Sequence, residues 1–282
     1  MKVGFLGPAG TFAEEALIEL AGTAGDLDVV PLPSVVDCFE SVRRGDVPEV
    51  LVPIENSMEG SVTQTLDQLA FGASPLMIRA QIEHPVRHHL VTGGAGDPAA
   101  LERVLSHPHA LAQCQRFLRA NLPGAETVAA HSTADAVRTV SGSGQPWAAI
   151  GTRRAADLYG GRVIAEDIAD GDDNTTRFVL VGPEPAPATG PGVFRTSIVC
   201  ALERDRPGAL LAILQEFAMR AVNLTRLESR PARTGLGRYV FFIDIEGSRE
   251  RDMAVDAAIT AIEQQGVAAV TSLGSYPVAG PH

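Results

Sequence analysis

The chain has almost no lysine, because Lys2 is its only one. This excludes two large classes of chemistry. A phosphate-binding Walker loop needs a lysine after its glycines. A Schiff base with pyridoxal phosphate or a ketone needs an internal lysine amine. Any catalysis by this chain must therefore proceed without a lysine at the reacting centre.

Cysteine is also scarce, and long apolar runs are missing. The three cysteines, Cys38, Cys114 and Cys200, are odd in number, far apart and form no C-x-x-C motif, which is typical of a reducing compartment. The first residues read as a strand and turn rather than a signal peptide, and no apolar stretch is long enough to span a bilayer. We therefore predict a cytoplasmic protein with no membrane partner.

Positive charge is in deficit. The chain has 34 acidic against 23 basic residues, a formal net charge of −11. This disfavours nucleic-acid partners, which need a basic surface, but it does not exclude an anionic substrate, which responds to the local field. The 282 residues, 45% of them hydrophobic, suit two or three domains with sizeable cores.

The first 182 residues alternate short apolar runs with helical patterns, which predicts an α/β fold with a mainly parallel sheet. We expect two α/β lobes, with the chain crossing back near residue 168 to complete the first lobe. Capping patterns at Thr11-x-x-Glu14, Ser34-x-x-Asp37 and Ser132-x-x-Asp135 open three of the helices. The strands are predicted near 3–6, 28–30, 50–54, 103–106, 127–130 and 148–151, and the other helices over 60–69, from 108 to about 120 and over 152–158. Residues 77–92 read as a long extended stretch with polar interruptions, and 162–165 start the return to the first lobe.

Ligands of such sheets bind beyond the carboxyl ends of the strands. Two loops leave those ends, 7–11 and 55–61. The first has glycines at 4, 7 and 10, which is the wrong spacing for a dinucleotide fingerprint. A helix start that holds an anion and a plain turn both stay open for it.

Residues 174–178, Asn-Thr-Thr-Arg-Phe, place hydroxyls and a guanidinium where an acidic loop, 170–173, enters a buried strand. Loops on a rigid scaffold carry most functional groups, so this is a candidate site. The alternative is a turn, a strand start and a surface arginine.

A Pro/Gly-rich stretch, 183–192, reads as a linker, and the segment after it has a β-α-β-β-α-β pattern. Its strands are expected over 196–203, 224–229, 239–245 and 267–273. One helix opens at Pro207-Gly208, and the other carries Val255, Ala258, Ile259 and Ile262 on one stripe. This order is typical of a ferredoxin-like fold.

Several spaced motifs follow one another along nearly the whole chain. They are Gly7-Pro8-Ala9-Gly10-Thr11-Phe12, Pro53-Ile54-Glu55-Asn56-Ser57-x-x-Gly60-Ser61-Val62, Ser106-His107-Pro108-x-Ala110-Leu111-x-Gln113-Cys114, Thr176-Arg177-Phe178, Gly208-Ala209-Leu210-Leu211 and Glu228-Ser229-Arg230-Pro231. Together they resemble the monofunctional prephenate dehydratases with a C-terminal ACT regulatory domain. No chorismate mutase segment precedes the first motif, so the resemblance does not imply the fused bifunctional form.

The resemblance implies a two-lobed catalytic domain like the periplasmic binding proteins, over 1–182. Lobe 1 would comprise 1–75 and 168–182, and lobe 2 would comprise 76–167. A linker over 183–193 and a ferredoxin-like ACT domain over 194–276 would follow.

The implied activity is that of a carbon–oxygen lyase, which converts prephenate to phenylpyruvate, water and carbon dioxide in phenylalanine biosynthesis, without metal or cofactor. By similarity, Thr176 would donate to the leaving hydroxyl, directly or through Glu55 or water, and Arg177 would anchor carboxylates. The other catalytic candidates are Glu55, Asn56, Ser106 and Gln113, and the other substrate-binding candidates are Thr11, Ser57 and Phe178.

Each candidate has a structural alternative. Glu55 and Asn56 would cap the next helix, Ser106 would be an N-cap, Gln113 a solvated helix residue and Arg177 a salt-bridge partner. His84, His88 and His89 would suggest a metal, but no carboxylate or thiol is spaced with them in a metal pattern, so we favour surface or satisfied histidines.

The resemblance further implies that L-phenylalanine binds between paired ACT domains of a homodimer or homotetramer as an allosteric effector. Two other functions stay open, an arogenate dehydratase and a non-catalytic two-lobed sensor with an amino-acid-binding tail. The implied effector residues are Gly208, Ala209, Leu210, Leu211, Asn223, Glu228, Ser229 and Arg230.

Overall fold

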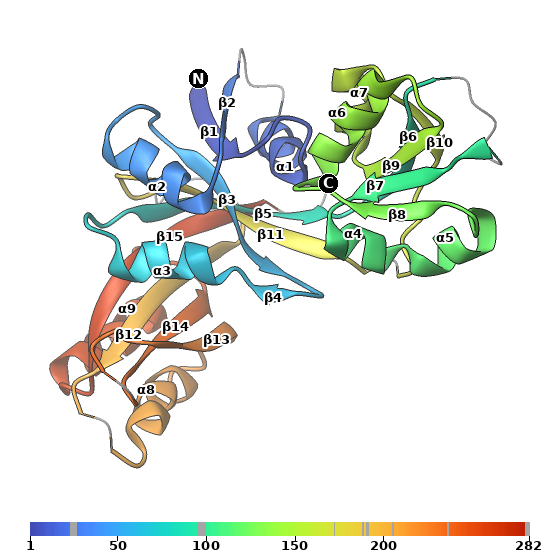
Figure 1. Cartoon of the computed structure of the whole chain (residues 1–282). Coiled ribbons are helices and arrows are strands. Elements are labelled where there is room, and N and C mark those ends of the chain that lie inside the picture. The colour runs from blue at the N-terminus through green and yellow to red at the C-terminus, as the bar shows by residue number, and fades with distance from the viewer. Residues whose placement is uncertain are drawn as a thin grey trace. The chain divides into compact units, whose positions relative to one another are not determined.

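The computed structural model describes most of the chain, and contacts between residues divide it into two compact units (Figure 1). The first unit comprises 1–65 and 83–178, and the second comprises 66–82 and the described residues from 179 on. Residues 66–82 and 179–182, which the prediction assigns to the catalytic domain, group here with the C-terminal residues. Because the two units do not correspond to the predicted domains, the domain boundaries stay a prediction. The described residues are 1–22, 27–94, 100–171, 173–187, 189, 192–204, 206–235 and 237–279. Asp172 of the predicted acidic loop and Ala188, Gly190 and Pro191 of the predicted linker lie outside them.

One sheet of the first unit is mainly parallel, as predicted. Its order is β11-β3-β1-β2, with β1 parallel to both β2 and β3, and the short β4 lies antiparallel to β3. Its strands are β1 (Lys2–Leu6), β2 (Asp28–Leu32), β3 (Val50–Asn56), β4 (Gly60–Ser61) and β11 (Thr175–Gly182), and its helices are α1 (Phe12–Ala21) and α2 (Val35–Arg43).

The helix predicted from residue 60 was wrong at its start. Gly60 and Ser61 form β4, and the helix α3 runs over Thr63–Phe71. Gly60 has a φ of +81°, which is unfavourable inside a right-handed helix, and it allows the chain to turn back along β3.

Local capping signals were mostly correct. The hydroxyls of Ser34 and Ser132 accept from the backbone N–H groups three residues later, as predicted. The capping box at Thr11 was wrong, because Thr11 makes no side-chain cap and its hydroxyl donates to Leu6 O at 3.2 Å. Glu14 is buried and pairs with Arg154 at 2.8 Å, and its second carboxylate oxygen accepts from the backbone N–H of Gly10 rather than that of Thr11.

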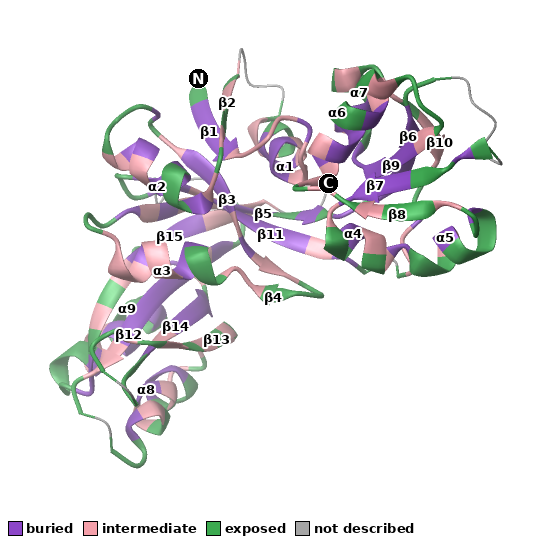
Figure 2. Cartoon of the chain, in the orientation of Figure 1, coloured by how far each residue is buried: buried purple, intermediate pink, exposed green. Residues whose placement is uncertain are grey.

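The second sheet of the first unit has the order β10-β6-β9-β7-β8 and carries helices on both faces (Figure 1). Successive strand residues face opposite sides, so Val104 packs in one core and Leu105 in the other, and Ala148 and Ala149 divide in the same way. Figure 2 shows the strand β9 of this sheet as mostly buried. The strands are β6 (His89–Thr92), β7 (Arg103–Ser106), β8 (Glu126–Ala129), β9 (Trp147–Gly151) and β10 (Arg162–Ala165). The helices are α4 (Pro108–Gln113), α5 (Gln115–Asn121), α6 (Thr133–Ser143) and α7 (Arg153–Tyr159). The single helix predicted from 108 to 120 is therefore two helices, interrupted at Cys114.

The second unit has the predicted ferredoxin-like order. Its sheet reads β13-β14-β12-β15-β5, and β15 is longer than predicted because its end pairs with β5. Ile213 and Phe217 of α8 and the predicted stripe of α9 pack on one face of this sheet. No helix among the described residues is long and apolar enough to cross a membrane. The elements are β5 (Met77–Pro85), β12 (Phe194–Leu202), α8 (Ala209–Ala218), β13 (Leu224–Pro231), β14 (Tyr239–Glu246), α9 (Met253–Gln264) and β15 (Ala268–Ala279).

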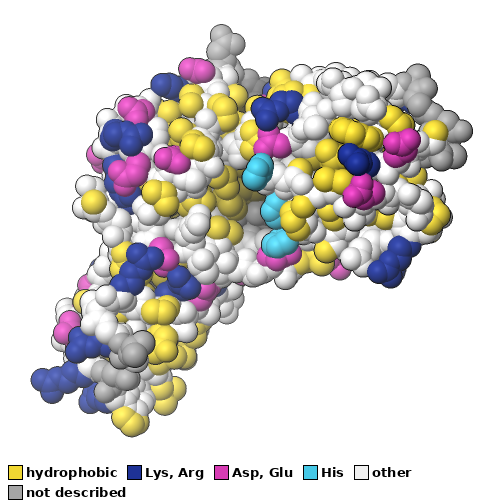
Figure 3. Space-filling view, viewed as in Figure 1, with side chains coloured by type: hydrophobic (Ala, Val, Ile, Leu, Met, Phe, Trp, Pro, Cys, Tyr) yellow, Lys and Arg dark blue, Asp and Glu magenta, His cyan; other side chains and the backbone are white. Residues whose placement is uncertain are grey.

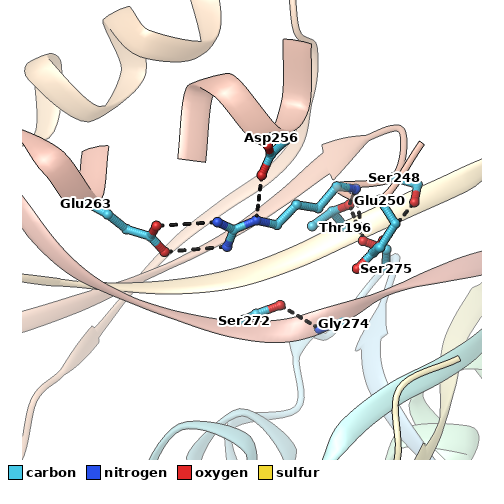
Figure 4. Close-up of polar contacts among 9 residues, drawn as sticks. Thr196, Ser248, Glu250, Asp256, Glu263, Ser272, Gly274 and Ser275 are labelled. Carbon is cyan, nitrogen blue, oxygen red and sulfur yellow. Dashed lines mark hydrogen bonds and ion pairs between the residues drawn. The ribbon is translucent and has the colours of Figure 1, made fainter. Parts of the chain in front are cut away.

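A polar cluster around Arg249 ties α9 to this sheet (Figure 4). The guanidinium lies 3.1 Å from the Asp256 carboxylate and 3.3 Å from that of Glu263. The backbone N–H of Arg249 donates to the hydroxyls of Thr196 and Ser275. We call these five residues the Arg249 cluster.

Candidate active site

The first unit contains a cavity of about 370 Å³, lined by residues of β3 and β11 in its first sheet and by helix and loop residues beside its second sheet. Histidine side chains gather beside a hollow in the space-filling view (Figure 3). The lining is mixed, with apolar walls and a group of hydroxyl, amide and imidazole side chains. It comprises Phe12, Pro53, Asn56, Glu59, Val62, Val86, His88, His107, His109, Ala110, Gln113, His131, Ser132, Thr133, Asn174 and Thr176.

Thr176, Asn56 and Gln113 are brought together at this cavity, as the sequence predicts. The side-chain nitrogen of Asn56 donates to Thr176 Oγ1 at 2.9 Å and to Asn174 Oδ1 at 2.7 Å. Asn174 Nδ2 donates to Gln113 Oε1 at 3.0 Å, and His88 Nε2 lies 2.9 Å from the same oxygen. We call this series His88, Gln113, Asn174, Asn56 and Thr176 the amide relay.

Arg177 and Glu55 lie elsewhere. Neighbouring residues of a strand point to opposite faces, so Arg177 faces away from the side that Thr176 occupies. Its guanidinium lies 3.0 Å from the Glu55 carboxylate, and neither residue lines the cavity. The salt-bridge alternative for Arg177 therefore fits the geometry better than a carboxylate anchor. Phe178 is 3% exposed and belongs to the core.

Three further candidates hold the backbone rather than line the cavity. Ser106 is fully buried, and its hydroxyl donates to Ile150 O at 2.7 Å, which ties β7 to β9. The helix after it has His107 as its N-cap residue, so Ser106 is not the cap. Ser57 Oγ donates to Asp173 O at 2.8 Å and accepts from Thr175 N, and Thr11 bonds to the end of β1.

Sequence reasoning missed the side chains that supply most of the cavity's titratable groups. Glu59 lines the cavity and lies 3.4 Å from His109, so Glu59 rather than Glu55 is the carboxylate at this site. The segment 131–133 also lines it, directly after the carboxyl end of β8. The rule that ligands bind at carboxyl ends of strands would have indicated this segment.

Two long helices begin at the cavity. Phe12 is the first residue of α1, and Ser132 is the N-cap residue of α6. Helix N-termini carry partial positive charge and unpaired N–H groups, so they favour anions. The cavity therefore offers an anion a favourable field although the described residues of its lining include no arginine.

The ionisation of nearby groups follows from burial. Burial lowers the pKa of His88 and outweighs its hydrogen bond with Gln113, and burial also lowers the pKa of His107. Burial, with a smaller effect of Asp170, raises the pKa of the Cys114 thiol to about 12. A thiolate nucleophile at Cys114 is therefore unfavourable near neutral pH.

The three histidines that suggested a metal are all buried, not on the surface. His84 is satisfied, since it lies 2.7 Å from Glu19 and 3.3 Å from Glu15. Among the residues that the structure describes, no group of three or more His, Cys, Asp or Glu side chains is arranged to hold a metal ion.

The candidate effector residues all lie in the second unit. Gly208 has a φ of +85° and precedes α8, with Ala209 buried and Leu211 exposed. Along β13, Glu228 and Arg230 are half-buried while Ser229 between them is exposed. Arg230 pairs with Asp67 at 2.9 Å, and the backbone carbonyl of Asn223 accepts from Glu246 N.

Similar solved structures share this architecture. A crystal structure described as prephenate dehydratase in complex with L-Phe from Arthrobacter aurescens has a TM-score of 0.88 and 39% identity, and the match covers 98% of this chain and 90% of that one. A protein described as GqqA, a novel type of quorum quenching acylase, has a TM-score of 0.86 at 26% identity, with 99% of this chain and 98% of that one covered.

Similar sequences carry consistent names. The prephenate dehydratase of Mycobacterium sp. (strain JLS) is 42% identical, across 98% of this chain and 89% of its own. The bifunctional chorismate mutase/prephenate dehydratase of Pseudomonas aeruginosa is 38% identical, across 99% of this chain and 74% of its own. The family model for prephenate dehydratase matches residues 3–186, and that for the ACT domain matches residues 196–258. The predicted family is thereby confirmed, and the chain belongs to the prephenate dehydratase family with an ACT domain.

Proposed function

We propose that this protein converts prephenate to phenylpyruvate with release of water and carbon dioxide. The observation that carries the proposal, beside family membership, is the state of the Thr176 hydroxyl. It lies at the cavity with its oxygen already accepting from the Asn56 amide. Its own proton is therefore left for the substrate, where it can assist departure of the ring hydroxyl, which is otherwise a poor leaving group.

The rest of the cavity suits the second bond cleavage. Phe12, Pro53, Val62 and Val86 form apolar walls. Exclusion of water removes the hydration that stabilises a carboxylate, so decarboxylation is favoured as the ring becomes aromatic. We assign the binding of the substrate's carboxylates to the helix starts of α1 and α6 and to the relay amides, in place of Arg177.

An acylase mechanism finds less support in this site. Acyl transfer by a threonine needs a base that removes the hydroxyl proton. The hydrogen-bond partner of Thr176 Oγ1 among the described residues is an amide, which cannot serve as a base, and the high pKa of Cys114 disfavours that thiol. We therefore propose no second activity.

The ACT domain is proposed to bind L-phenylalanine as an allosteric effector and to pair in a homodimer or homotetramer. The support is the Arthrobacter protein with L-Phe, together with the edge strand β13 and the exposed Leu211 and Leu227. Exposed edge strands and apolar side chains favour pairing with a second copy. The three buried free thiols suit a cytoplasmic location.

The activity is tested with purified protein and prephenate, with arogenate as a parallel substrate and without added metal or cofactor. We expect phenylpyruvate at catalytic rates and a preference for prephenate. Folded protein that yields no product from prephenate at high enzyme concentration contradicts the proposal, and a preference for arogenate changes the substrate but keeps the chemistry.

The effector is tested separately. L-phenylalanine at about 100 times its Kd is expected to raise the free energy of unfolding by about 2.7 kcal/mol and to change activity. D-phenylalanine is the control. If the L-isomer shifts neither the melting temperature nor the activity, the tail is not a phenylalanine site.

A further inference from the structure

The turn after β3 fixes the direction of every hydrogen bond in the amide relay. The backbone N–H groups of Met58 and Glu59 lie 2.9 and 3.0 Å from Asn56 Oδ1. A backbone N–H only donates, so the atom that it meets must be the oxygen of the Asn56 amide. The amide nitrogen of Asn56 then points toward Asn174 and Thr176.

The direction passes along the relay. Because Asn174 Oδ1 accepts from Asn56, the nitrogen of Asn174 is on its other side and donates to Gln113 Oε1. Gln113 therefore presents its oxygen to His88 Nε2 at 2.9 Å. An oxygen at that place requires a proton on His88 Nε2.

The other ring nitrogen of His88 carries no proton. The side chain is buried, at 3% exposure, and Nδ1 has no hydrogen-bond partner among the described residues. A second N–H at Nδ1 would be a buried donor without an acceptor, inside a site that already disfavours charge. The neutral imidazole with its proton on Nε2 keeps the bond to Gln113 and avoids both a buried charge and an unpaired donor at Nδ1.

We propose that His88 is a positioning residue that, with Asn174, occupies both acceptor positions of Gln113 Oε1 and so turns the Gln113 amide nitrogen to the substrate. Gln113 lines the cavity, and its Nε2 has no partner among the described residues. Gln113 Nε2 can only donate a hydrogen bond, so it suits a carboxylate or keto oxygen of the substrate and not an ammonium group. The inference rests on the proposed function of this cavity.

A purely structural role for His88 makes a different prediction. The ring packs edge-on against Phe12, with centroids 5.5 Å apart and planes at 75°. If packing were the whole role, only the size and shape of the side chain would matter, and the place of its N–H would not.

The first test is the tautomer of His88 in the substrate-free wild-type protein, measured by ¹⁵N NMR with His88→Gln for assignment. We expect a neutral ring at neutral pH with the proton on Nε2. A ring protonated on Nδ1, or an imidazolium, overturns the proposal. The measurement does not depend on turnover, so a wild-type protein that is inactive on prephenate would contradict the proposed function and leave this result standing.

The second test compares three variants. His88→Gln places an N–H near the position of Nε2, His88→Asn places one near Nδ1, and His88→Leu has none. We expect kcat to fall about tenfold in His88→Leu and His88→Asn and to stay within about threefold of wild type in His88→Gln. Equal kcat in all three, or no better turnover in folded His88→Gln than in His88→Asn, overturns the proposal.

Discussion

Two polar clusters of this protein differ in how their hydrogen-bonding groups are paired. In the Arg249 cluster of the second unit, the guanidinium meets the carboxylates of Asp256 and Glu263, and the backbone N–H meets two hydroxyls (Figure 4). In the amide relay of the first unit, Asn56 donates to Asn174 and Thr176 and Asn174 donates to Gln113, which leaves the Thr176 O–H and Gln113 Nε2 beside a cavity. A cluster that stabilises a fold pairs its groups internally, whereas one that serves chemistry keeps donors for a ligand.

The sharpest way to break this comparison is to remove the last donor of the relay. Thr176→Val keeps the shape of the side chain but not the hydroxyl. Because the leaving hydroxyl loses its donor, we expect kcat on prephenate to fall by about 10² to 10³. The measurement is steady-state kinetics, with binding of the product phenylpyruvate by calorimetry expected to change only a few-fold.

Thr176→Ser is the matched control, since it retains the hydroxyl and is expected to keep most of the activity. Near-normal kcat in Thr176→Val would remove Thr176 from the mechanism.

A smaller loss of kcat is expected when the donor nitrogen of Asn56 is replaced by an acceptor. In Asn56→Asp an oxygen replaces the nitrogen that donates to Thr176 and Asn174. The Thr176 proton then turns to the carboxylate instead of the substrate, and we expect kcat to fall by about 10- to 100-fold.

Ser106→Ala is the control for that variant, because the Ser106 hydroxyl bonds to Ile150 O away from the cavity lining. We expect it to cost about 1 kcal/mol of stability, read from urea unfolding, with kcat unchanged. A similar loss of kcat in both variants would mean that Ser106 acts on the cavity after all.

A substitution in the Arg249 cluster should change the stability of the protein and not its kcat. Arg249→Met removes two ion pairs of a side chain that is 26% exposed, so we expect a loss of about 1 kcal/mol or less and an unchanged kcat. Arg44→Met is the control, since Arg44 and Asp46 are both more than half exposed and should contribute less. A change in kcat would show that this cluster is coupled to the active site.

The smallest expected effect is on the pH dependence of stability when His84 is replaced. Burial alone lowers its pKa, but hydrogen bonds and charges of Glu15 and Glu19 outweigh burial, so the pKa is raised. A histidine whose pKa is raised by folding stabilises the folded state at pH values below its unfolded pKa of about 6.5. That stabilisation is lost as the pH rises through its folded pKa. His84→Gln should therefore lose more stability near pH 6 than near pH 9, by less than about 1 kcal/mol.

His88 provides the opposite case within the same unit. Burial lowers the pKa of His88. The stability that the neutral ring contributes is therefore complete above about pH 6.5, the unfolded pKa, and is lost as the pH falls. Unfolding of His84→Gln and His88→Gln at both pH values should show opposite trends. A loss in His84→Gln that does not vary with pH would contradict the ion pairs with Glu15 and Glu19.

The architecture was largely accessible from the sequence because it follows from local patterns. The caps at Ser34 and Ser132, the stripe on α9 and the order of elements after residue 194 depend on residues that are near each other in the chain. Two failures occurred where a distant residue intervened. Glu14 pairs with Arg154, and Asp170 bonds to Arg116 N and to Gln113 O where the helix after Pro108 is interrupted.

The residues of the candidate site likewise divide into those that motifs in the sequence indicate and those that only the structure reveals. Motifs identified Thr176, Asn56 and Gln113, and strand alternation would have separated Thr176 from Arg177 without a structure. His88 and Asn174 carried no motif that assigned them a role. They matter through one amide oxygen of Gln113, which no spacing along the chain reveals.

The sequence by itself determined the fold class and the family and indicated Thr176 as a candidate, because periodicity and spaced motifs are properties of the chain. Only the tertiary structure decided which way the donors point. Two backbone N–H groups after β3 orient the Asn56 amide, and that orientation passes through Asn174 and Gln113 to His88. The stretch around Thr176 is thus one end of a polar relay whose polarity depends on residues from four separate parts of the chain.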